Sequence, residues 1–376
     1  MSAAGIIFSN LNDQNLSRLT ADRTVAAIPF GCRYRLVDFA LSNMVNAGIS
    51  DISLIANYNY RSLNEHIGSG KDWDLARRAG GIKFISPYQT ARTPNTVMYS
   101  HHLEALKSMQ EFILEISEDT VVLCDTDDIC NIDLAAVIAE HEERGADITM
   151  VTTPCTPDFS SKQAVMMVSS DDAGMVTGIV KSQTPVEGYC DRFINIYIAR
   201  TAYLTYILNM SFSENLQSLS EDVLMKHIGE RKYFVHRFDG FVAHVSSFTD
   251  YYRHSIALAK DQSIGRELFG EKTRPVYTKV HNSAPVLYRA GAKVVNSMIA
   301  DGCVIEGTVE NSILFRGVKI GRGAVVRDSV LFGGTDIGDG STIQCVVADK
   351  HVAVSAHSTL SGAPTLPFFI SKGRRV

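Results

Sequence analysis

Asn296-Ser297-Met298-Ile299, Asn311-Ser312-Ile313-Leu314 and Asp328-Ser329-Val330-Leu331 are three copies of one phrase, 15 and then 17 residues apart. Each copy is followed by a glycine and then an isoleucine: Gly302 and Ile305, Gly317 and Ile320, Gly334 and Ile337. Regular aliphatic positions with glycines at the corners predict a parallel β-helix of about three coils, in which each coil buries its face by stacking on the next. A small antiparallel sandwich is the alternative.

The chain before about residue 255 has a different pattern. Short apolar runs with the length of buried parallel strands lie at residues 6–8, 52–55, 120–123 and 148–151. Amphipathic stretches with helical spacing lie at residues 37–47 and 102–116. This alternation predicts an α/β domain with an open, mostly parallel sheet and helices on both faces, whose ligands bind beyond the carboxyl ends of the strands.

The length of the chain fits two domains. At 376 residues and 41.3 kDa it exceeds what one ordinary core holds. The change of pattern then predicts an α/β domain at residues 1–255, a linker at 256–284 and a β-helix at 285–376.

Composition argues against several classes of protein. The formal net charge of -5 gives no basic field for nucleic-acid binding, and no apolar run approaches the roughly 18 residues of a membrane span. The N-terminus lacks the pattern of a secretory signal, and the seven cysteines are odd in number without C-x-x-C spacing. We therefore expect a cytoplasmic protein with reduced thiols and no nucleic-acid or membrane partner. No tightly bound cofactor is expected either.

Three segments carry a resemblance to a known family. Residues 28–43 read I-P-F-G-C-R-Y-R-L-V-D-F-A-L-S-N, and residues 62–68 read S-L-N-E-H-I-G, with W-D-L at 73–75. They resemble P-F-G-G-K-Y-R-I-I-D-F-x-L-S-N and S-L-N-E-H-I-G…W-D-L of the ADP-glucose pyrophosphorylase (glucose-1-phosphate adenylyltransferase) family. Residues 274–278, R-P-V-Y-T, are similar to the family's W-P-I-Y-T, so the resemblance spans essentially the whole chain.

The resemblance implies a Rossmann-like nucleotidyltransferase domain followed by a left-handed β-helix. It also implies a reaction in which the phosphate of glucose 1-phosphate attacks the α-phosphorus of ATP, giving ADP-glucose and pyrophosphate for glycogen synthesis. Chemistry of this kind requires a backbone cradle for phosphates, cations that neutralise charge, and carboxylates that hold Mg²⁺.

The nucleotide loop departs from the family pattern. The family's G-G-x-G-x-R-L-x-x-L-T falls on residues 10–20, where no glycine remains and Asp13 would repel a phosphate. The family's arginine in this loop falls on Asn15, and the lysine of its A-K-P falls on Val25, so two phosphate-neutralising cations are lost. Arg18, about one helical turn beyond Asn15, is the alternative cation.

The expected magnesium site is incomplete. Asp127 matches the first metal-binding aspartate of the family, with Asp133 further along the chain. The second aspartate falls on His244, and imidazole is a poor ligand for a hard ion such as Mg²⁺. We expect at most a weak metal site at Asp127.

The sugar-binding segments are also altered. The family's G-T-A-D falls on residues 94–97, its E-K-P near residues 180–183 and its A-S-M-G-I-Y on residues 192–197. Lys181 and Asp222 remain as partial relics of this side of the site.

These losses together predict little or no activity for the chain alone, because such groups act as a unit. The pattern resembles GlgD-type regulatory subunits of the family, which assemble with a catalytic GlgC-type partner and raise its activity. We expect a heterotetramer with that partner or a homotetramer, with Mg²⁺ serving only the partner's reaction. An active sugar-phosphate nucleotidyltransferase with a remodelled ATP loop is the alternative, and an acyltransferase using His351 and His357 is a weaker one.

Basic residues suggest a regulatory ligand. Arg23 falls where the family places basic residues near its effector cleft between the two domains. Arg33 and Arg35 suit contact with an anion or ion pairs with Asp38 and Glu65. A sugar-phosphate effector is therefore an expected partner, and the retained phrases at residues 28–43 and 62–75 are expected to serve the fold and subunit contacts.

Overall fold

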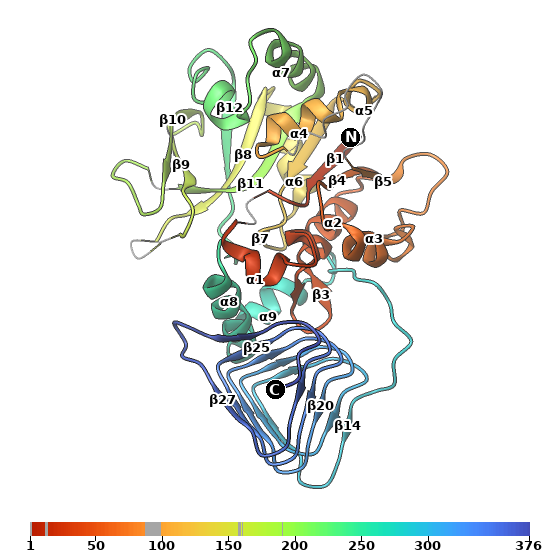
Figure 1. Ribbon diagram of the computed structural model, residues 1–376. Coiled ribbons are helices and arrows are strands. Elements are labelled where there is room, and N and C mark those ends of the chain that lie inside the picture. The colour runs from red at the N-terminus through yellow and green to blue at the C-terminus, as the bar shows by residue number, and fades with distance from the viewer. Residues whose placement is uncertain (1, 12–13, 87–98, 157–158, 160, 190) are drawn as a thin grey trace.

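The computed structural model describes residues 2–11, 14–86, 99–156, 159, 161–189 and 191–376. An α/β domain forms the first part of the molecule and a triangular stack of coils forms the second (Figure 1). The two patterns in the sequence therefore correspond to two architectures in space.

Among the described residues, a nine-stranded mixed sheet forms the centre of the α/β domain. Across it lie β12 (Tyr233–Arg237), β8 (Ile148–Pro154), β11 (Asp191–Arg200), β6 (Thr120–Cys124), β1 (Ala3–Phe8), β4 (Asp51–Ile55) and β5 (Gly81–Ile85). Of these seven strands only β11 is antiparallel to its neighbours. β9 (Val165–Ser170) pairs with the first two residues of β11, and β10 (Val176–Ser182) pairs with β9. The four predicted strands are confirmed as β1, β4, β6 and β8.

Helices cover both faces of this sheet. Alternate residues of β1 point to opposite faces, so Ile6 and Phe8 join one core cluster and Ile7 joins the other. The first cluster includes residues of α4 (His102–Ser108), α5 (Gln110–Leu114) and α7 (Thr201–Ser213). The second includes residues of α2 (Leu36–Asn46), α3 (Arg61–Ile67) and α6 (Leu134–Arg144). The helix predicted at residues 102–116 is divided into α4 and α5 at the buried Met109.

The second part is a left-handed parallel β-helix of five coils built from three five-stranded sheets. The first sheet contains β14 (Leu287–Tyr288), β17 (Val304–Ile305), β20 (Lys319–Ile320), β23 (Asp336–Ile337) and β26 (Ala353–Val354). The second contains β15 (Lys293–Val295), β18 (Thr308–Glu310), β21 (Val325–Arg327), β24 (Thr342–Gln344) and β27 (Thr359–Ser361). The third contains β16 (Met298–Ile299), β19 (Ile313–Leu314), β22 (Val330–Leu331), β25 (Val346–Ala348) and β28 (Phe368–Ile370).

The prediction of about three coils was too low, and the backbone at one corner shows why. Asn296, Asn311 and Asp328 open the three recognisable phrases and have φ of 44°, 50° and 44°, a left-handed conformation that Asn and Asp adopt more easily than most residues. Cys345 occupies the same corner of the fourth coil with φ of 51°. The geometry therefore repeats where the letters no longer do.

The serine of each phrase links neighbouring coils. Ser312 N–H donates to Ser297 Oγ, Ser329 N–H to Ser312 Oγ and Val346 N–H to Ser329 Oγ, each at 3.1 Å. A buried backbone N–H needs a partner, and the hydroxyl one coil below supplies it. The phrase thus supplies both the turn at the corner and a row of hydrogen bonds between neighbouring coils.

Helices and one buried ion pair join the two parts. α1 (Ser17–Thr20), α8 (Phe248–Lys260) and α9 (Gln262–Phe269) lie at the junction, where residues of both parts form one apolar cluster (Figure 1). Arg23 Nη2 lies 2.7 and 2.9 Å from the two carboxylate oxygens of Asp349 in the β-helix, and both side chains are buried. The division at residues 255 and 285 stays a prediction, and α8 runs across the first of these positions.

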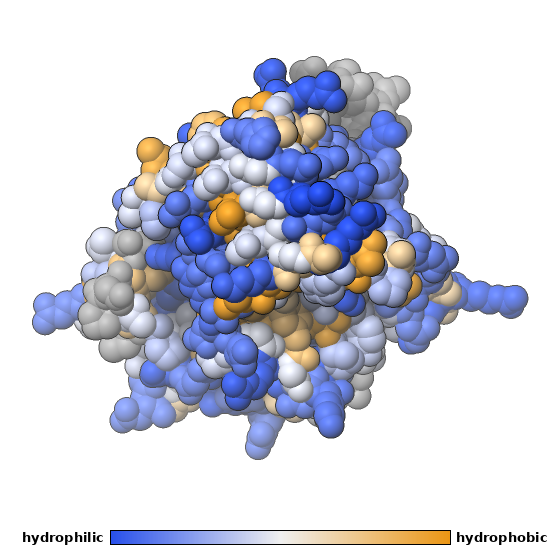
Figure 2. All heavy atoms as spheres, turned by 90° about the horizontal axis from the view of Figure 1, so that it is seen from below, coloured by the Kyte–Doolittle hydropathy of each residue, from blue (hydrophilic) through white to orange (hydrophobic). Residues whose placement is uncertain are grey.

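The face formed by the β-helix, seen from below, is mostly hydrophilic, with hydrophobic residues in small separate groups (Figure 2). Within the described residues, no helix has the length and hydropathy needed to cross a bilayer. Five buried cysteines, Cys32, Cys124, Cys130, Cys303 and Cys345, form no disulfide among the described residues.

Candidate functional site

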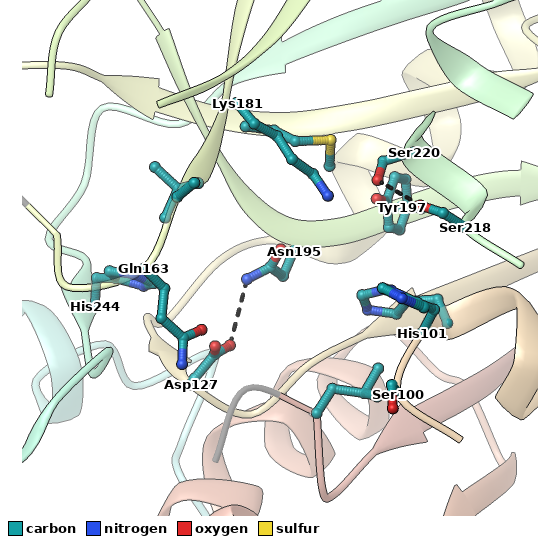
Figure 3. Close-up of a pocket in the computed structure, with 15 residues that line it drawn as sticks. Ser100, His101, Asp127, Gln163, Lys181, Asn195, Tyr197, Ser218, Ser220 and His244 are labelled. Atoms are coloured by element: carbon teal, nitrogen blue, oxygen red, sulfur yellow. Dashed lines mark hydrogen bonds between the residues drawn. The ribbon is translucent and has the colours of Figure 1, made fainter. Parts of the chain in front are cut away.

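A pocket of about 100 Å³ lies beyond the carboxyl ends of β1 and β6, the place that the parallel sheet predicts (Figure 3). Segments far apart in the sequence line it: Leu11, Ser100, His101, His102, Asp127, Gln163, Ala164, Val165, Met166, Lys181, Asn195, Tyr197, Ser218, Ser220 and His244. Of the residues singled out in the sequence, Asp127, Lys181 and His244 meet here.

The first acidic group of the site is a buried Asp–His pair. Asp125 follows β6, and its Oδ1 lies 2.8 Å from Nε2 of His102 at the start of α4. Burial lowers the pKa of His102, but the adjacent Asp125 more than offsets this, so the pKa lies above the usual value. Asp125 Oδ2 and the Tyr197 hydroxyl are buried without a hydrogen-bond partner among the described residues.

The second acidic group centres on Asp128 in β7 (Asp128–Ile129). Arg192 Nη1 donates to Asp128 Oδ1 at 2.9 Å, and His244 Nδ1, in β13 (Ala243–His244), lies 3.0 Å from the same oxygen. Burial raises the pKa of Asp128, but Arg192 and His244 outweigh it and bring the pKa to about 2. Asn195 Nδ2 donates to Asp128 Oδ2 at 3.2 Å. It also donates to Asp127 Oδ1 at 3.4 Å (Figure 3). Asp128 is thus ionised and compensated by groups of the protein itself.

The opposite wall carries one lysine and several hydroxyls. Lys181 points into the pocket from β10 (Figure 3), and its Nζ lies 2.6 Å from Oε1 of Glu221. Asp222 does not line the pocket; its Oδ2 accepts from the backbone N–H groups of Gln217 and Ser218 at 3.0 Å each. Asp222 therefore stabilises the turn that places Ser218 and Ser220 in the wall.

Side chains of the protein itself occupy or fix the segment that corresponds to the nucleotide loop. Asn10 Oδ1 accepts from Asn57 N–H at 2.8 Å and its Nδ2 donates to Tyr58 O at 3.2 Å, so a side chain ties the end of β1 to the end of β4. Val25 is 1% exposed and belongs to the apolar cluster at the junction with the β-helix. Asn15 is exposed and does not line the pocket, while Asp13 lies outside the described residues.

Arg18 does not replace the missing cations. Its guanidinium carbon lies 5.3 Å from the centroid of the Phe248 ring, at a groove beside the last coil of the β-helix. Arg18, the alternative cation in the sequence, is therefore not among the described residues that line the pocket.

Sequence reasoning missed most of the wall. It assigned no role to His101, His102, Gln163, Asn195, Tyr197, Ser218, Ser220 or to Arg192, which contacts Asp128. Asn195 and Tyr197 lay in the segment that was compared with A-S-M-G-I-Y, and the adjacent histidines at the start of an expected helix were the other available signal. Residues 94–97, on which G-T-A-D was placed, lie outside the described residues.

A second cavity, of about 380 Å³, lies between the α/β domain and the β-helix. It is lined by Pro29, Cys32, Arg33, Tyr34, Arg35, His66, His281, Phe315, Arg316, Gly333, Gly334, Lys350 and His351, and we call it the basic cleft. Burial lowers the pKa of Lys350, and the neighbouring Arg35 and Arg23 lower it further, to about 8. Positive charge is therefore crowded here in a way that a bound anion would relieve.

Two of the three arginines expected at an effector site lie in this cleft. Arg33 and Arg35 line it, whereas Arg23 is committed to its ion pair with Asp349 and does not. In place of ion pairs with Arg33 or Arg35, Asp38 pairs with His66 at 2.6 Å, and Glu65 pairs with Arg61 at 2.8 Å.

The retained family phrases contact each other directly. The Asp38–His66 pair joins residues 28–43 to residues 62–75, and Arg35 Nη1 donates to Ser62 O at 2.6 Å. Their structural role is therefore explained by these contacts within the fold.

The first pocket suits a polar ligand with hydroxyl and anionic groups, but its carboxylates do not suit Mg²⁺. Within the described residues, no three His, Cys, Asp or Glu side chains form a group that could hold a metal ion. Asp128 already forms an ion pair with Arg192. His244 supplies a nitrogen atom at this position, whereas Mg²⁺ prefers oxygen ligands.

Comparisons with known proteins agree with this architecture. A family described as nucleotidyl transferase matches residues 6–217, and one described as GlmU-like, C-terminal hexapeptide matches residues 285–363. The glycogen biosynthesis protein GlgD of Bacillus subtilis is 33% identical over 374 residues, 98% of this chain and 95% of that protein. GlgD of Geobacillus stearothermophilus is 33% identical over 86% of this chain and 82% of its own length. The glucose-1-phosphate adenylyltransferase of Thermosipho africanus is 28% identical over 87% of this chain and 78% of its own length.

Proposed function

Since the chain belongs to the ADP-glucose pyrophosphorylase (glucose-1-phosphate adenylyltransferase) family and resembles its GlgD members, we propose that it is a regulatory subunit in glycogen biosynthesis. In this role it has little or no adenylyltransferase activity of its own and activates a catalytic subunit with which it assembles. The observation that carries the proposal is the burial of Val25 at the position where the family resemblance places a lysine of the active site.

The rest of the nucleotide side supports this role. Leu11 is the one residue among the described part of the first forty that lines the pocket, and Asn10 fixes the loop through its side chain. A triphosphate needs exposed backbone N–H groups and cations, because its charge must be neutralised while water is excluded. Asn10, Leu11 and Val25 carry no cationic side chain.

The proposal is tested by pyrophosphate release from ATP, Mg²⁺ and glucose 1-phosphate. The isolated chain is expected to turn over at least about a hundredfold more slowly than a catalytic family member, since loss of even one charge-stabilising group costs 10²–10³ in rate. Adding the chain to that partner is expected to raise turnover per catalytic subunit and to give a mixed complex by light scattering. Robust turnover by this chain alone would instead favour an active enzyme with a remodelled ATP loop.

The assembly we propose is a heterotetramer with the catalytic subunit, or a homotetramer in its absence. Apolar side chains are exposed on the first coil of the β-helix, at Leu287 and Tyr288, and near its last coil, at Leu366 and Phe368. Residues of this kind gain stability when a second subunit covers them.

We further propose that the basic cleft holds the effector, a sugar phosphate. Arg33, Arg35, Arg316 and Lys350 line it together, and phosphate groups favour such clusters of donors. The cavity between the α/β domain and the β-helix also couples the ligand to the relative placement of both parts.

Binding in the basic cleft is expected to weaken as pH rises through 8. Lys350 has a pKa of about 8, and only its protonated form attracts the phosphate. Because the phosphate itself remains a dianion above pH 7, the affinity for glucose 6-phosphate should fall roughly tenfold between pH 7 and pH 9. Isothermal titration calorimetry at the two pH values measures this.

Substitution of Lys350 separates the two sources of pH dependence. Lys350→Met is expected to bind more weakly at pH 7 and to lose the difference between pH 7 and pH 9. Lys372→Met serves as the control, since Lys372 is half exposed and does not line the cleft. An unchanged pH profile in Lys350→Met would place the ligand elsewhere.

A further inference from the structure

A buried arginine lies behind the pocket beyond β6, against the acidic segment that follows this strand. Arg192 lies at the second residue of β11, between Thr153 of β8 and Met167 of β9, and is 4% exposed. Its guanidinium carbon is 5.6 Å from the centroid of the Phe159 ring, and Nη1 donates to Asp128 Oδ1 at 2.9 Å. Packing and hydrogen bonding therefore fix this cation against the acidic segment.

The carboxylates beside it occupy the position from which a metal ion would be held. Asn195 Nδ2 contacts oxygens of both Asp127 and Asp128, so the two carboxylates face the same amide group. Asp127 is the aspartate that the family resemblance assigns to Mg²⁺. An ion held by Asp128 would have to share this carboxylate with the guanidinium of Arg192.

His244 strengthens the same arrangement. Its Nδ1 lies 3.0 Å from Asp128 Oδ1, the same oxygen that accepts from Arg192. Its Nε2 is buried and has no hydrogen-bond partner within the described residues. The position assigned to the second metal carboxylate thus contributes an imidazole, which is a poor ligand for a hard ion such as Mg²⁺.

We propose that Arg192 is a built-in cation that takes the place of the divalent metal ion on the Asp127–Asp128 pair and excludes it. A guanidinium keeps its charge at every physiological pH and presents several planar donors to carboxylates. It therefore neutralises Asp128 without a metal, and it repels a second cation at close range. The proposal concerns metal binding alone and is independent of whether the chain regulates a partner.

Metal binding to the full chain tests the proposal directly. Mn²⁺, which prefers the same oxygen ligands as Mg²⁺ and is followed by its paramagnetic resonance, is titrated into wild type, Arg192→Gln and Arg192→Lys. Wild type and Arg192→Lys, which keep a cation, should bind no Mn²⁺ at this site up to about 1 mM. Arg192→Gln should bind at least tenfold more tightly than wild type, and the added Asp127→Asn change should abolish the gain.

Arg237→Gln is the matched control. Arg237 lies on β12, is about half exposed and pairs with Asp191 and Asp239 at 3.7 and 3.2 Å, so the variant removes an arginine from an acidic neighbourhood outside the pocket. It should behave as wild type does. A gain of Mn²⁺ binding in Arg237→Gln equal to that in Arg192→Gln would overturn the proposal.

A stability measurement covers the case in which Arg192→Gln folds poorly. A ligand that binds only the native state raises the melting temperature, so 5 mM Mg²⁺ should stabilise Arg192→Gln and leave wild type and Arg192→Lys unchanged. Wild-type binding of Mn²⁺ that Asp127→Asn removes would contradict the proposal, as would a folded Arg192→Gln that binds no metal. Both results are read without pyrophosphate release, so they are distinct from a failure of the regulatory function.

Discussion

Arg23→Met is expected to lower the free energy of unfolding by about 3–5 kcal/mol, because it leaves the buried carboxylate of Asp349 without its partner. The two side chains are 3% and 7% exposed, and Arg23 also donates to Leu19 O at 3.2 Å. Since Arg23 belongs to the α/β domain and Asp349 to the β-helix, the variant should loosen the junction as well. Urea unfolding followed by circular dichroism measures the loss.

Two further variants isolate the cause. Arg61→Met breaks an ion pair whose members, Arg61 and Glu65, are exposed, and no measurable loss is expected. In Arg23→Met combined with Asp349→Leu, no charge is left unpaired, and most of the stability should return. If Arg23→Met proves as stable as Arg61→Met, the junction does not depend on this pair.

The two architectures could be predicted from the sequence because each leaves a local period. Buried strands such as β1 and β6 are short apolar runs, and the corner residues Asn296, Asn311 and Asp328 repeat for a conformational reason. The fourth coil escaped prediction because Cys345 adopts the same left-handed backbone without resembling the phrase. The backbone conformation at this corner therefore continues into the fourth coil, where the sequence repeat is no longer recognisable.

The candidate site could be predicted only in part: Asp127 and Lys181 line the pocket as the sequence indicated, and the other signals were residue types that were missing. The resemblance directed attention to Asn15, Val25 and His244, and the structure shows Val25 in the core and Asn15 at the surface. It could not indicate Arg192, since its partner Asp128 lies 64 positions earlier and meets it only through the order of strands in the sheet. Pairings between distant segments carry no local signal.

The same limit applies to Arg23. The sequence placed it at an effector cleft because of its position relative to basic residues of the family, yet its guanidinium is consumed by Asp349, 326 positions away. The cleft is instead completed by Lys350 and Arg316, which belong to the β-helix. Because residues of both domains line this cleft, the sequence of either domain alone shows only isolated basic residues.

Val25→Lys tests whether restoring the family's lysine can restore the chemistry, and we expect that it cannot. Val25 lies in the short helical turn Val25–Ala27, is 1% exposed and packs in the cluster that contains Leu16 and Leu19. A lysine there must give up its hydration. Buried lysines show pKa values lowered by about 4 units at about 1.4 kcal/mol each, so a loss on the order of 5 kcal/mol is expected.

Val25→Met is the control that separates charge from size, because methionine is similar in volume to lysine but uncharged. It should lower the free energy of unfolding by only about 1–3 kcal/mol. Urea unfolding of both variants gives the difference, and pyrophosphate release gives the activity. If Val25→Lys matched Val25→Met in stability and gained turnover, the lysine would have reached the pocket. The expected result is the reverse: the turn after α1 now belongs to the apolar junction with the β-helix, so a single substitution adds a buried charge without rebuilding a phosphate site.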